Sequence, residues 1–456
     1  MSTSDYKADA LKAKEKLNEV SPTMCLAKWN QVSLHLPTGL TNSCYHPPLH
    51  KIDAEEVKKN PAALHNTVEK LDQRFKMLQG QRPKGCSYCW KMEDTGEMSD
   101  RHYRSGEPWA MQDFEAIKKN PMTTRWTPRY VEVNFNHACN FKCSYCSPQF
   151  STTWGKETER YGEFPTTPPH NAPEHFQGRN RPIPHRESNP YVTAFWKWWP
   201  ELYKNLKHFR MTGGEPMMDH NTYKVFQYII DHPKDDLTLN ITSNMCPPDN
   251  KLKTKYFNML QKICLEEKVE HVMQFVSVDA WGKRAEYIRH GLDFNRMWDN
   301  VDEFLERIPH RNSVTFICTY NNLSITSMDK LLQGIMDLRQ RHSKSYQRVW
   351  FDVPLLRQPA WQQITLLPES YQDIHKTNIE YMQENSKHDN GLHLFKDFEI
   401  QKMLRNLAYW RTNADSSTQF KKNFYAFFNE HDRRRQTNFL NTFPEMEEFW
   451  MECKNA

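Results

Sequence analysis

Short apolar runs alternate with longer amphipathic segments through the middle of the chain. Six runs rich in Val, Ile, Phe and Thr recur between Tyr130 and Pro354, namely YVEVNF, HFRMT, LTLNIT, HVMQFVSVD, SVTFICTY and RVWFDVP. Segments able to form helices separate most of them, such as NTYKVFQYIIDH after the second run and FNRMWDNVDEFLERI after the fourth. A strand followed by a helix, repeated about six times, predicts a parallel β/α sheet or a partial barrel.

The flanking segments follow other patterns. Residues 1–24 are polar and charged and predict a solvated helix or arm, whereas residues 25–115 hold four cysteines in a mixed, turn-rich pattern. After Leu355 the pattern becomes helical and polar. We therefore expect a core over residues 125–355 and a helical C-terminal region over residues 356–456.

One long segment interrupts the β/α alternation. Between Trp154 and Leu206 the chain is dense in Pro, His, Arg and Trp. A loop of this length inside a compact domain is usually functional or disordered, so a surface excursion and a substrate lid are equally favoured. Its AFWKWWPELY end is too aromatic to remain in water, and we expect it to pack on the barrel.

Composition narrows the class of protein. The 456 residues carry a formal charge of +5, which is small for this length and makes nucleic acid an unfavoured partner. The N-terminus has no apolar core typical of a signal peptide, and no run of apolar residues is long enough to span a membrane. We expect a cytoplasmic protein with no membrane partner. In that compartment, eleven cysteines favour metal or redox chemistry over disulfides.

Three of those cysteines form a compact array. Cys139, Cys143 and Cys146 have C-x3-C-x2-C spacing and directly follow the first predicted strand. Three thiolates on a [4Fe–4S] cluster would leave one iron open to a small molecule. The carboxyl ends of strands carry the chemistry in β/α barrels, and this position is such an end. The alternative is a structural zinc site with a distant fourth ligand such as His137.

The second predicted strand runs directly into MTGGEPMMD, which contains Gly213, Gly214, Glu215 and Pro216. Two glycines allow the backbone to approach a ligand closely, and the following carboxylate can bind an ammonium group. With the upstream cysteine array, the chain resembles the radical S-adenosylmethionine (SAM) enzymes over about residues 130–355. The resemblance implies an α/β fold, a partial (β/α)6 TIM-like barrel with an N-terminal cysteine-rich auxiliary-cluster domain and a helical C-terminal extension.

The same resemblance implies a cofactor site. The three cysteines would ligate a [4Fe–4S] cluster whose fourth iron is chelated by the amine and carboxylate of SAM. Tyr145 would lie against the adenine, the GGEP stretch would hold the methionine amine, and the third and fourth strand ends would contact the ribose or carboxylate. An arginine after the fourth strand completes the set. The residues so assigned to SAM are Tyr145, Gly213, Gly214, Glu215, Pro216, Ser243, Asn244, Ser277, Asp279 and Arg289.

The implied reaction is reductive cleavage of SAM to a 5′-deoxyadenosyl radical that abstracts a substrate hydrogen. The electron would come from a flavodoxin- or ferredoxin-type donor. Because the cofactor carries the difficult step, no side chain needs to act as the initiating base. The resemblance therefore names no catalytic residue of its own.

A second set of cysteines precedes the core. Cys25 and Cys44 are followed by the pair Cys86 and Cys89, and four thiolates in two pairs are typical of a structural zinc site. However, C-x13-G-x4-C resembles the opening of the twitch and SPASM auxiliary-cluster domains, and the single following pair fits the shorter twitch type. This resemblance implies a second, fully ligated [4Fe–4S] cluster within residues 25–115. In the best-described members that domain follows the barrel, whereas here it precedes it.

The remaining cysteines and one basic run have ordinary interpretations. Cys264 and Cys453 lie in helix-like segments and are expected in the core. Cys246 lies just past the third predicted strand and Cys318 lies within the fifth, and for both packing is favoured over hydrogen-atom donation. The DRRRQ run at residues 432–436 is interpreted as a solvated helix end rather than a patch that binds phosphate or nucleic acid.

Substrate identity is left between two classes. A peptide or protein fits the resemblance to auxiliary-cluster members, and a small carbohydrate or nucleotide metabolite is the competing enzyme substrate. The rival from another class is a non-enzymatic zinc or iron–sulfur protein. That rival would bind metal without cleaving SAM.

Overall fold

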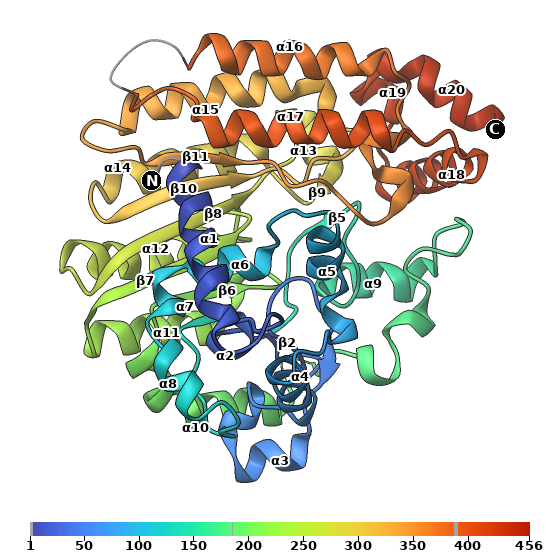
Figure 1. The fold of residues 1–456 in the computed structure, drawn as a ribbon. Coiled ribbons are helices and arrows are strands. Elements are labelled where there is room, and N and C mark those ends of the chain that lie inside the picture. The colour runs from blue at the N-terminus through green and yellow to red at the C-terminus, as the bar shows by residue number, and fades with distance from the viewer. Residues whose placement is uncertain (1–2, 185, 387–390) are drawn as a thin grey trace. The chain divides into compact units, whose positions relative to one another are not determined.

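The computed structural model describes residues 3–184, 186–386 and 391–456, and Figure 1 labels the elements along the ribbon. The chain divides into two compact units. The first comprises Met1–Asn136, Arg181–Gly213 and Asp236–Asn240. The second comprises His137–Asn180, Gly214–Asp235 and Ile241–Ala456. Each unit is described separately below.

The first unit contains a mixed sheet. Strands β1 (Gln31–His35), β4 (Tyr130–Asn134) and β6 (His208–Thr212) are parallel, with β4 in the middle. Two short strands, β2 (Leu40–Asn42) and β3 (His50–Lys51), extend it antiparallel beyond β1. Alternate apolar side chains of the parallel strands are fully buried, as the period-two pattern of these runs requires.

Helices cover this sheet and form a core around Trp29 and Trp109. The aromatic end of the long segment forms α10 (Pro190–Asn205), and Trp199 packs on Phe209 of β6 with ring centroids 4.9 Å apart. The expectation that this aromatic end packs on the sheet is therefore confirmed. The other helices of the unit are α1 (Thr3–Asn18), α2 (Ala27–Asn30), α3 (Ala54–Lys59), α4 (Val68–Leu78), α5 (Ser87–Asp94), α6 (Asp100–Gly106), α7 (Pro108–Met111) and α8 (Phe114–Lys119).

The second unit contains its own parallel strands. Strands β8 (Val269–Ser277), β10 (Asn312–Ile317) and β11 (Val349–Asp352) are parallel, with β10 in the middle. A separate antiparallel pair joins β5 (Lys142–Cys143) to β9 (Arg289–His290). Strand β7 (Lys234–Ser243) contributes residues to both units.

Amphipathic helices surround these strands. In α14 (Phe294–Arg307), Asp293 caps the N-terminus, and the buried side chains Met297, Val301 and Phe304 recur at helical spacing. Arg339 of α15 (Met328–His342) pairs with Glu399 of α17 (Asp397–Thr412) at 2.6 Å, with both side chains fully buried. The remaining helices are α9 (Thr152–Tyr161), α11 (His220–Asp231), α12 (Asn250–Leu265), α13 (Lys283–Ile288), α16 (Tyr371–Glu384), α18 (Thr418–Arg435), α19 (Phe439–Thr442) and α20 (Glu447–Asn455).

All six predicted strands and the helical C-terminal region are confirmed, and the fold is mixed α/β with parallel strands. Strands β1, β2, β3, β5 and β9 were not predicted from the sequence. The partial barrel and the four domain boundaries stay predictions, and residues 1 and 2 of the expected arm lie outside the described residues. No described helix combines the length and apolar character that a bilayer span requires.

Candidate metal centres

The three-cysteine loop lies in the second unit and includes the short strand β5. Cys143 belongs to β5 and is in register with Arg289 of β9. The Phe141 amide donates to Cys139 Sγ at 3.4 Å, and Arg289 Nη1 donates to Cys143 Sγ at 3.5 Å. Burial, with a smaller contribution from neighbouring Cys143, raises the pKa of the Cys146 thiol to about 12. The Cys139 and Cys143 sulfurs thus already receive N–H donors suited to thiolates, whereas the Cys146 thiol donates to the Ser147 carbonyl oxygen at 3.8 Å.

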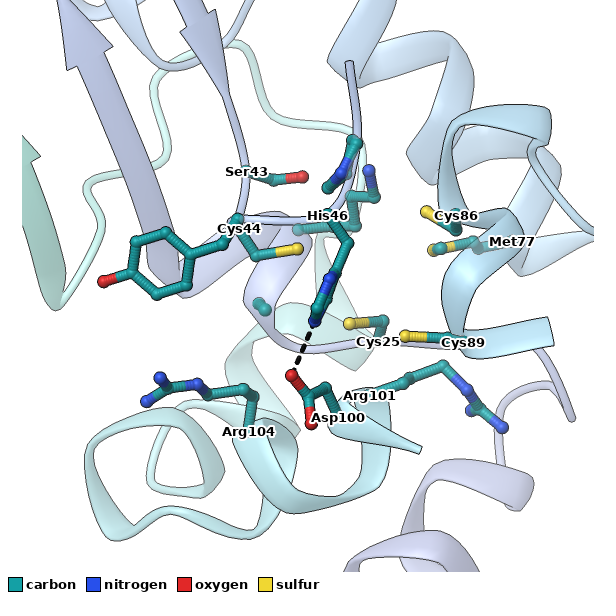
Figure 2. A pocket seen from close by; sticks show the side chains of 14 residues that line it. Cys25, Ser43, Cys44, His46, Met77, Cys86, Cys89, Asp100, Arg101 and Arg104 are labelled. Atoms are coloured by element: carbon teal, nitrogen blue, oxygen red, sulfur yellow. Dashed lines mark hydrogen bonds and ion pairs between the residues drawn. The ribbon is translucent and has the colours of Figure 1, made fainter. Parts of the chain in front are cut away.

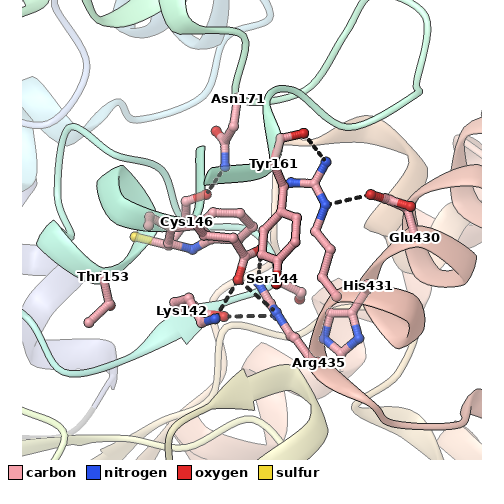
Figure 3. Close-up of polar contacts among 12 residues, drawn as sticks. Lys142, Ser144, Cys146, Thr153, Tyr161, Asn171, Glu430, His431 and Arg435 are labelled. Carbon is pink, nitrogen blue, oxygen red and sulfur yellow. Dashed lines mark hydrogen bonds and ion pairs between the residues drawn. The ribbon is translucent and has the colours of Figure 1, made fainter. Parts of the chain in front are cut away.

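A buried ion-pair network supports this loop from α9 and α18, as Figure 3 shows. Arg435 Nη1 donates to the Lys142 carbonyl oxygen at 3.2 Å, and the Arg435 guanidinium pairs with Glu157 at 3.2 Å. Lys142 pairs with the same carboxylate. Trp154 Nε1 donates to the Cys143 carbonyl oxygen at 2.9 Å. The carbonyl groups of Lys142 and Cys143 are therefore both held by side chains, one from α18 and one from α9.

This network corrects one expectation. The DRRRQ run was expected to be a solvated helix end, but of its three arginines only Arg433 has an exposed side chain, at 62%. Arg434 is buried and donates to the carbonyl oxygens of Gly162 and Glu163, and Arg435 is buried against Trp154. Two of the three arginines are internal because their charges meet Glu430 and Glu157, which the local sequence does not reveal.

Glu215 occupies a buried position next to the cysteine loop. Its carboxylate accepts hydrogen bonds from Ser243 Oγ at 2.7 Å, the Asn244 amide at 2.8 Å and the Met217 amide at 3.0 Å. Burial raises the pKa of Glu215, and these three donors act in the opposite direction. Among the described residues, no lysine, arginine or histidine forms an ion pair with it. The site therefore holds a carboxylate with polar neighbours and no cation.

Direct contacts join Glu215 to the cysteine loop. The Glu215 amide donates to the Ala138 carbonyl oxygen at 2.7 Å. Asn244 Nδ2 donates to Asn140 Oδ1 at 2.9 Å, and Asn140 Nδ2 donates to the Cys246 carbonyl oxygen at 2.8 Å. Asn140 was not singled out from the sequence. Its position between Cys139 and Cys143 is the one signal that could have found it.

Asp279, Arg289 and Tyr145 form a second buried group. The fully buried Asp279 carboxylate pairs with Arg289 Nε at 2.8 Å, accepts from Tyr145 Oη at 2.7 Å and from the Thr319 amide at 2.9 Å. Arg289 Nη2 also donates to Tyr145 Oη at 2.6 Å. Burial lowers the pKa of Arg289, but Asp279, Tyr145 and Cys143 together outweigh this and leave the pKa well above its usual value. The Arg289 charge is thereby fixed beside Cys143.

The remaining residues assigned to SAM are placed less closely. Pro216 begins a short 3-10 turn, Pro216–Met218, directly after Glu215. Ser277 ends β8, and its side chain donates to none of the described residues in the two groups above. Gly213 has a φ of +76°, and a Cβ there would lie 1.9 Å from Asn134 Cγ. Gly213 is therefore required by a close approach to Asn134, and Gly214, with a φ of 28°, also lies in the left-handed region.

The four N-terminal cysteines meet in the first unit. Figure 2 shows the sulfur atoms of Cys25, Cys44, Cys86 and Cys89 turned toward a shared space. They come from the loop before α2, the loop after β2, a short turn and α5, and all four line one cavity of about 20 Å3. Burial, with smaller contributions from the other three thiols, raises the pKa of the Cys25 thiol to about 12. The two cysteine pairs predicted from the sequence, Cys25 with Cys44 and Cys86 with Cys89, thus line the same cavity.

The donor sets fit clusters in number and kind. All eleven cysteines are free thiols. Among the described residues, no group of three His, Cys, Asp or Glu side chains is gathered around one point as a single metal ion would require. Each thiolate of a [4Fe–4S] cluster binds a different iron, so a cluster spaces its ligands more widely than a single ion does.

No known family model and no curated protein matches the chain. Solved structures that resemble it include Streptococcus suis SuiB, at 12% sequence identity and a TM-score of 0.38, covering 80% of this chain and 69% of that chain. SuiB bound to S-adenosylmethionine and SuiB bound to precursor peptide SuiA give the same 12% identity, with TM-scores of 0.38 and 0.39. They cover 78% and 87% of this chain, and 69% and 77% of theirs. A likeness at this level does not establish a family.

Proposed function

We propose that the chain is a radical SAM enzyme that carries an auxiliary iron–sulfur cluster. Cys139, Cys143 and Cys146 would ligate the SAM-binding [4Fe–4S] cluster. When bound, this cluster would supply the electron that cleaves the C–S bond of SAM to give the 5′-deoxyadenosyl radical. Reduction would come from a flavodoxin- or ferredoxin-type donor. A peptide or protein is the substrate class that the resemblance implies.

One observation carries the proposal. The cysteine loop and the GGEP stretch, about 70 residues apart in sequence, are joined by the Glu215–Ala138 hydrogen bond, and Glu215 is left buried without a cation. A buried carboxylate of this kind is costly unless a positive partner binds it. The ammonium group of SAM is a partner of the right charge, and it would lie beside the iron that three cysteines leave open.

The chain's own residues would then perform distinct tasks. Glu215 would bind the ammonium, with Ser243 and Asn244 holding its carboxylate in place. Arg289 would place a fixed positive charge beside the Cys143 thiolate. Asp279 would hold that arginine and Tyr145, and its assigned contact with the ribose stays a prediction.

The four-cysteine cavity would hold the second cluster. All four of its thiols line one cavity, and the resemblance to the twitch-type domains favours an iron–sulfur cluster over zinc there. With all four cysteines engaged, we assign this cluster a role in electron transfer or structure.

Reductive cleavage of SAM tests the proposal. Anaerobically reconstituted, dithionite-reduced protein should form methionine and 5′-deoxyadenosine slowly without substrate. Cys143→Ala should abolish cleavage, because its cluster would be lost. Cys264→Ala is a matched control, since Cys264 is a buried thiol of α12 remote from both cysteine sets in sequence.

Two readouts decide the result. Product is measured by chromatography, and iron content is measured in the same samples. Equal formation of 5′-deoxyadenosine by wild type and by an iron-depleted Cys143→Ala protein would place the reaction outside this site. The enzymatic assignment would then fail.

A further inference from the structure

Three cations are fully buried in the first unit, close to the four-cysteine cavity. The relative exposures of Lys28, Lys70 and Arg74 are 1%, 0% and 0%. Lys28 Nζ donates to Gln73, and Lys70 Nζ lies 2.8 Å from His65 Nδ1. These partners are neutral groups. The two lysines thus have hydrogen-bond partners, but no carboxylate among the described residues pairs with either of them.

Arg74 is placed in the same way. Its Nη2 donates to the Lys28 carbonyl oxygen at 2.9 Å, and its Nη1 donates to Asn66 Oδ1 at 2.9 Å. Its guanidinium lies 5.4 Å from the centroid of the Trp29 ring. Among the described residues, none of the three cations forms an ion pair with a carboxylate. Buried charges without a counter-charge oppose folding strongly, so an anionic partner is expected nearby.

The cavity supplies that partner. Lys28 lines it together with the four cysteines. Burial, with Arg74 and Lys28, lowers the pKa of Lys70 well below its usual value, so Lys28 is the buried cation that lies against the thiols. The anionic group that Lys28 can face is therefore a thiolate of the cavity.

Two other cationic or titratable side chains of the cavity lining have carboxylate partners. Arg101 pairs with Glu93 at 2.8 Å, and His46 contacts Asp100 at 2.6 Å. Arg104, which also lines the cavity, lies over the Tyr45 ring. Lys28 differs from Arg101 and His46 because its side chain contacts Gln73 and no carboxylate among the described residues. The positive charge of Lys28 can therefore stabilise a negatively charged group bound by the four thiolates.

We propose that Lys28 is the counter-charge of an anionic metal–thiolate centre in this cavity and raises its reduction potential. The inference rests on the auxiliary cluster proposed above. Four thiolates around an oxidised [4Fe–4S] core make a doubly negative centre, which becomes triply negative when one electron is added by the donor. A nearby positive charge stabilises the reduced centre more than the oxidised one.

A redox titration measures this effect directly. The full chain carrying Cys139→Ala, Cys143→Ala and Cys146→Ala leaves only the cavity to bind a cluster, whose reduction is followed by electron paramagnetic resonance. In that background Lys28→Met should lower the equilibrium constant for reduction about tenfold, which is about 59 mV for one electron. Lys84→Met is the matched control, because Lys84 is exposed and lies two residues before Cys86. It should change the constant less than threefold. Equal potentials in the two variants would overturn the proposal.

Thermal unfolding provides a second test with a distinctive sign. Lys28→Met removes an unbalanced charge from the metal-free protein and should raise its Tm. The same change removes the counter-charge from the loaded protein and should reduce the gain in Tm on reconstitution. If Lys28 served only to pack, its replacement would lower both the Tm of the metal-free protein and the gain in Tm on reconstitution. That result would overturn the proposal.

The two assignments fail separately. If the cavity takes zinc rather than iron, the auxiliary cluster is wrong, but a zinc tetrathiolate is also doubly negative. Lys28→Met should then weaken zinc binding at least tenfold relative to Lys84→Met, measured by competition with a chelator. Equal zinc affinities in the two variants would overturn the counter-charge itself.

Discussion

The two cysteine-lined sites differ in how their buried charges are balanced. At the three-cysteine loop, Arg289 is answered by Asp279 at 2.8 Å and Arg435 by Glu157 at 3.2 Å. The charge left over there is negative, on Glu215. At the four-cysteine cavity the charge left over is positive and lies on the buried side chain of Lys28.

This difference indicates what each site is built to receive. Paired charges hold the three-cysteine loop in shape by themselves, so the loop is organised as the second unit folds. Its remaining carboxylate suits a ligand with an ammonium group. The cavity of the first unit lacks such internal balance, and its cations suit an anionic centre. Under the proposed function, one site would receive a cationic cofactor group and the other a negatively charged cluster.

Among the variants that distinguish the two sites, Arg435→Met should have the largest effect, because it acts on the three-cysteine loop and leaves the four-cysteine cavity unchanged. The variant leaves Glu157 with Lys142 as its ion-pair partner and removes the donor to the Lys142 carbonyl oxygen. Loss of one partner of a buried pair should reduce the free energy of unfolding by about 3 kcal/mol. The three-cysteine site should also lose iron, while the four-cysteine cavity keeps its own. Denaturant unfolding and iron analysis of the reconstituted protein measure the two effects.

Arg433→Met is the control for that experiment, because Arg433 lies two residues earlier on α18 with an exposed side chain. It should change stability by less than about 0.5 kcal/mol. Iron lost equally from both sites of the Arg435→Met protein would contradict a local role for the network.

Glu215→Ala should have a smaller effect, confined to the cofactor. One charge-assisted contact contributes about 1.5–3 kcal/mol, so SAM should bind roughly ten- to a hundredfold more weakly to the reconstituted protein. Glu215→Gln keeps the shape of the side chain and removes its charge, and it should lose most of the same affinity. Equilibrium dialysis with labelled SAM measures both. Wild-type affinity in the Gln variant would show that the ammonium does not meet this carboxylate.

Much of this arrangement was accessible from the sequence. The six core strands were found because apolar runs of strand length, bounded by helical segments, report local structure. The cysteine spacings and the GGEP stretch pointed to the residues that the structure brings together in the second unit. The pairing of β1 with β4 was not found, because the two strands are about 100 residues apart and the register depends on tertiary packing.

The electrostatic partners were the least predictable part. Arg435 and Glu157 are 278 positions apart, and a run of three arginines on a polar helix has the composition of a solvated end. Asp279 was assigned to a ribose from its strand-end position, whereas the structure surrounds it with Arg289, Tyr145 and Thr319. Local patterns predict which residues are polar, but they do not predict which buried side chains form ion pairs with one another.

The metal content of the reconstituted protein tests the central claim most directly. Two [4Fe–4S] clusters require about eight irons per chain. Replacing Cys139, Cys143 and Cys146 with Ala should remove one half, and replacing Cys25, Cys44, Cys86 and Cys89 should remove the other. One zinc with about four irons would contradict the auxiliary cluster. Iron that is retained in full after both sets are replaced would contradict the assignment of either centre.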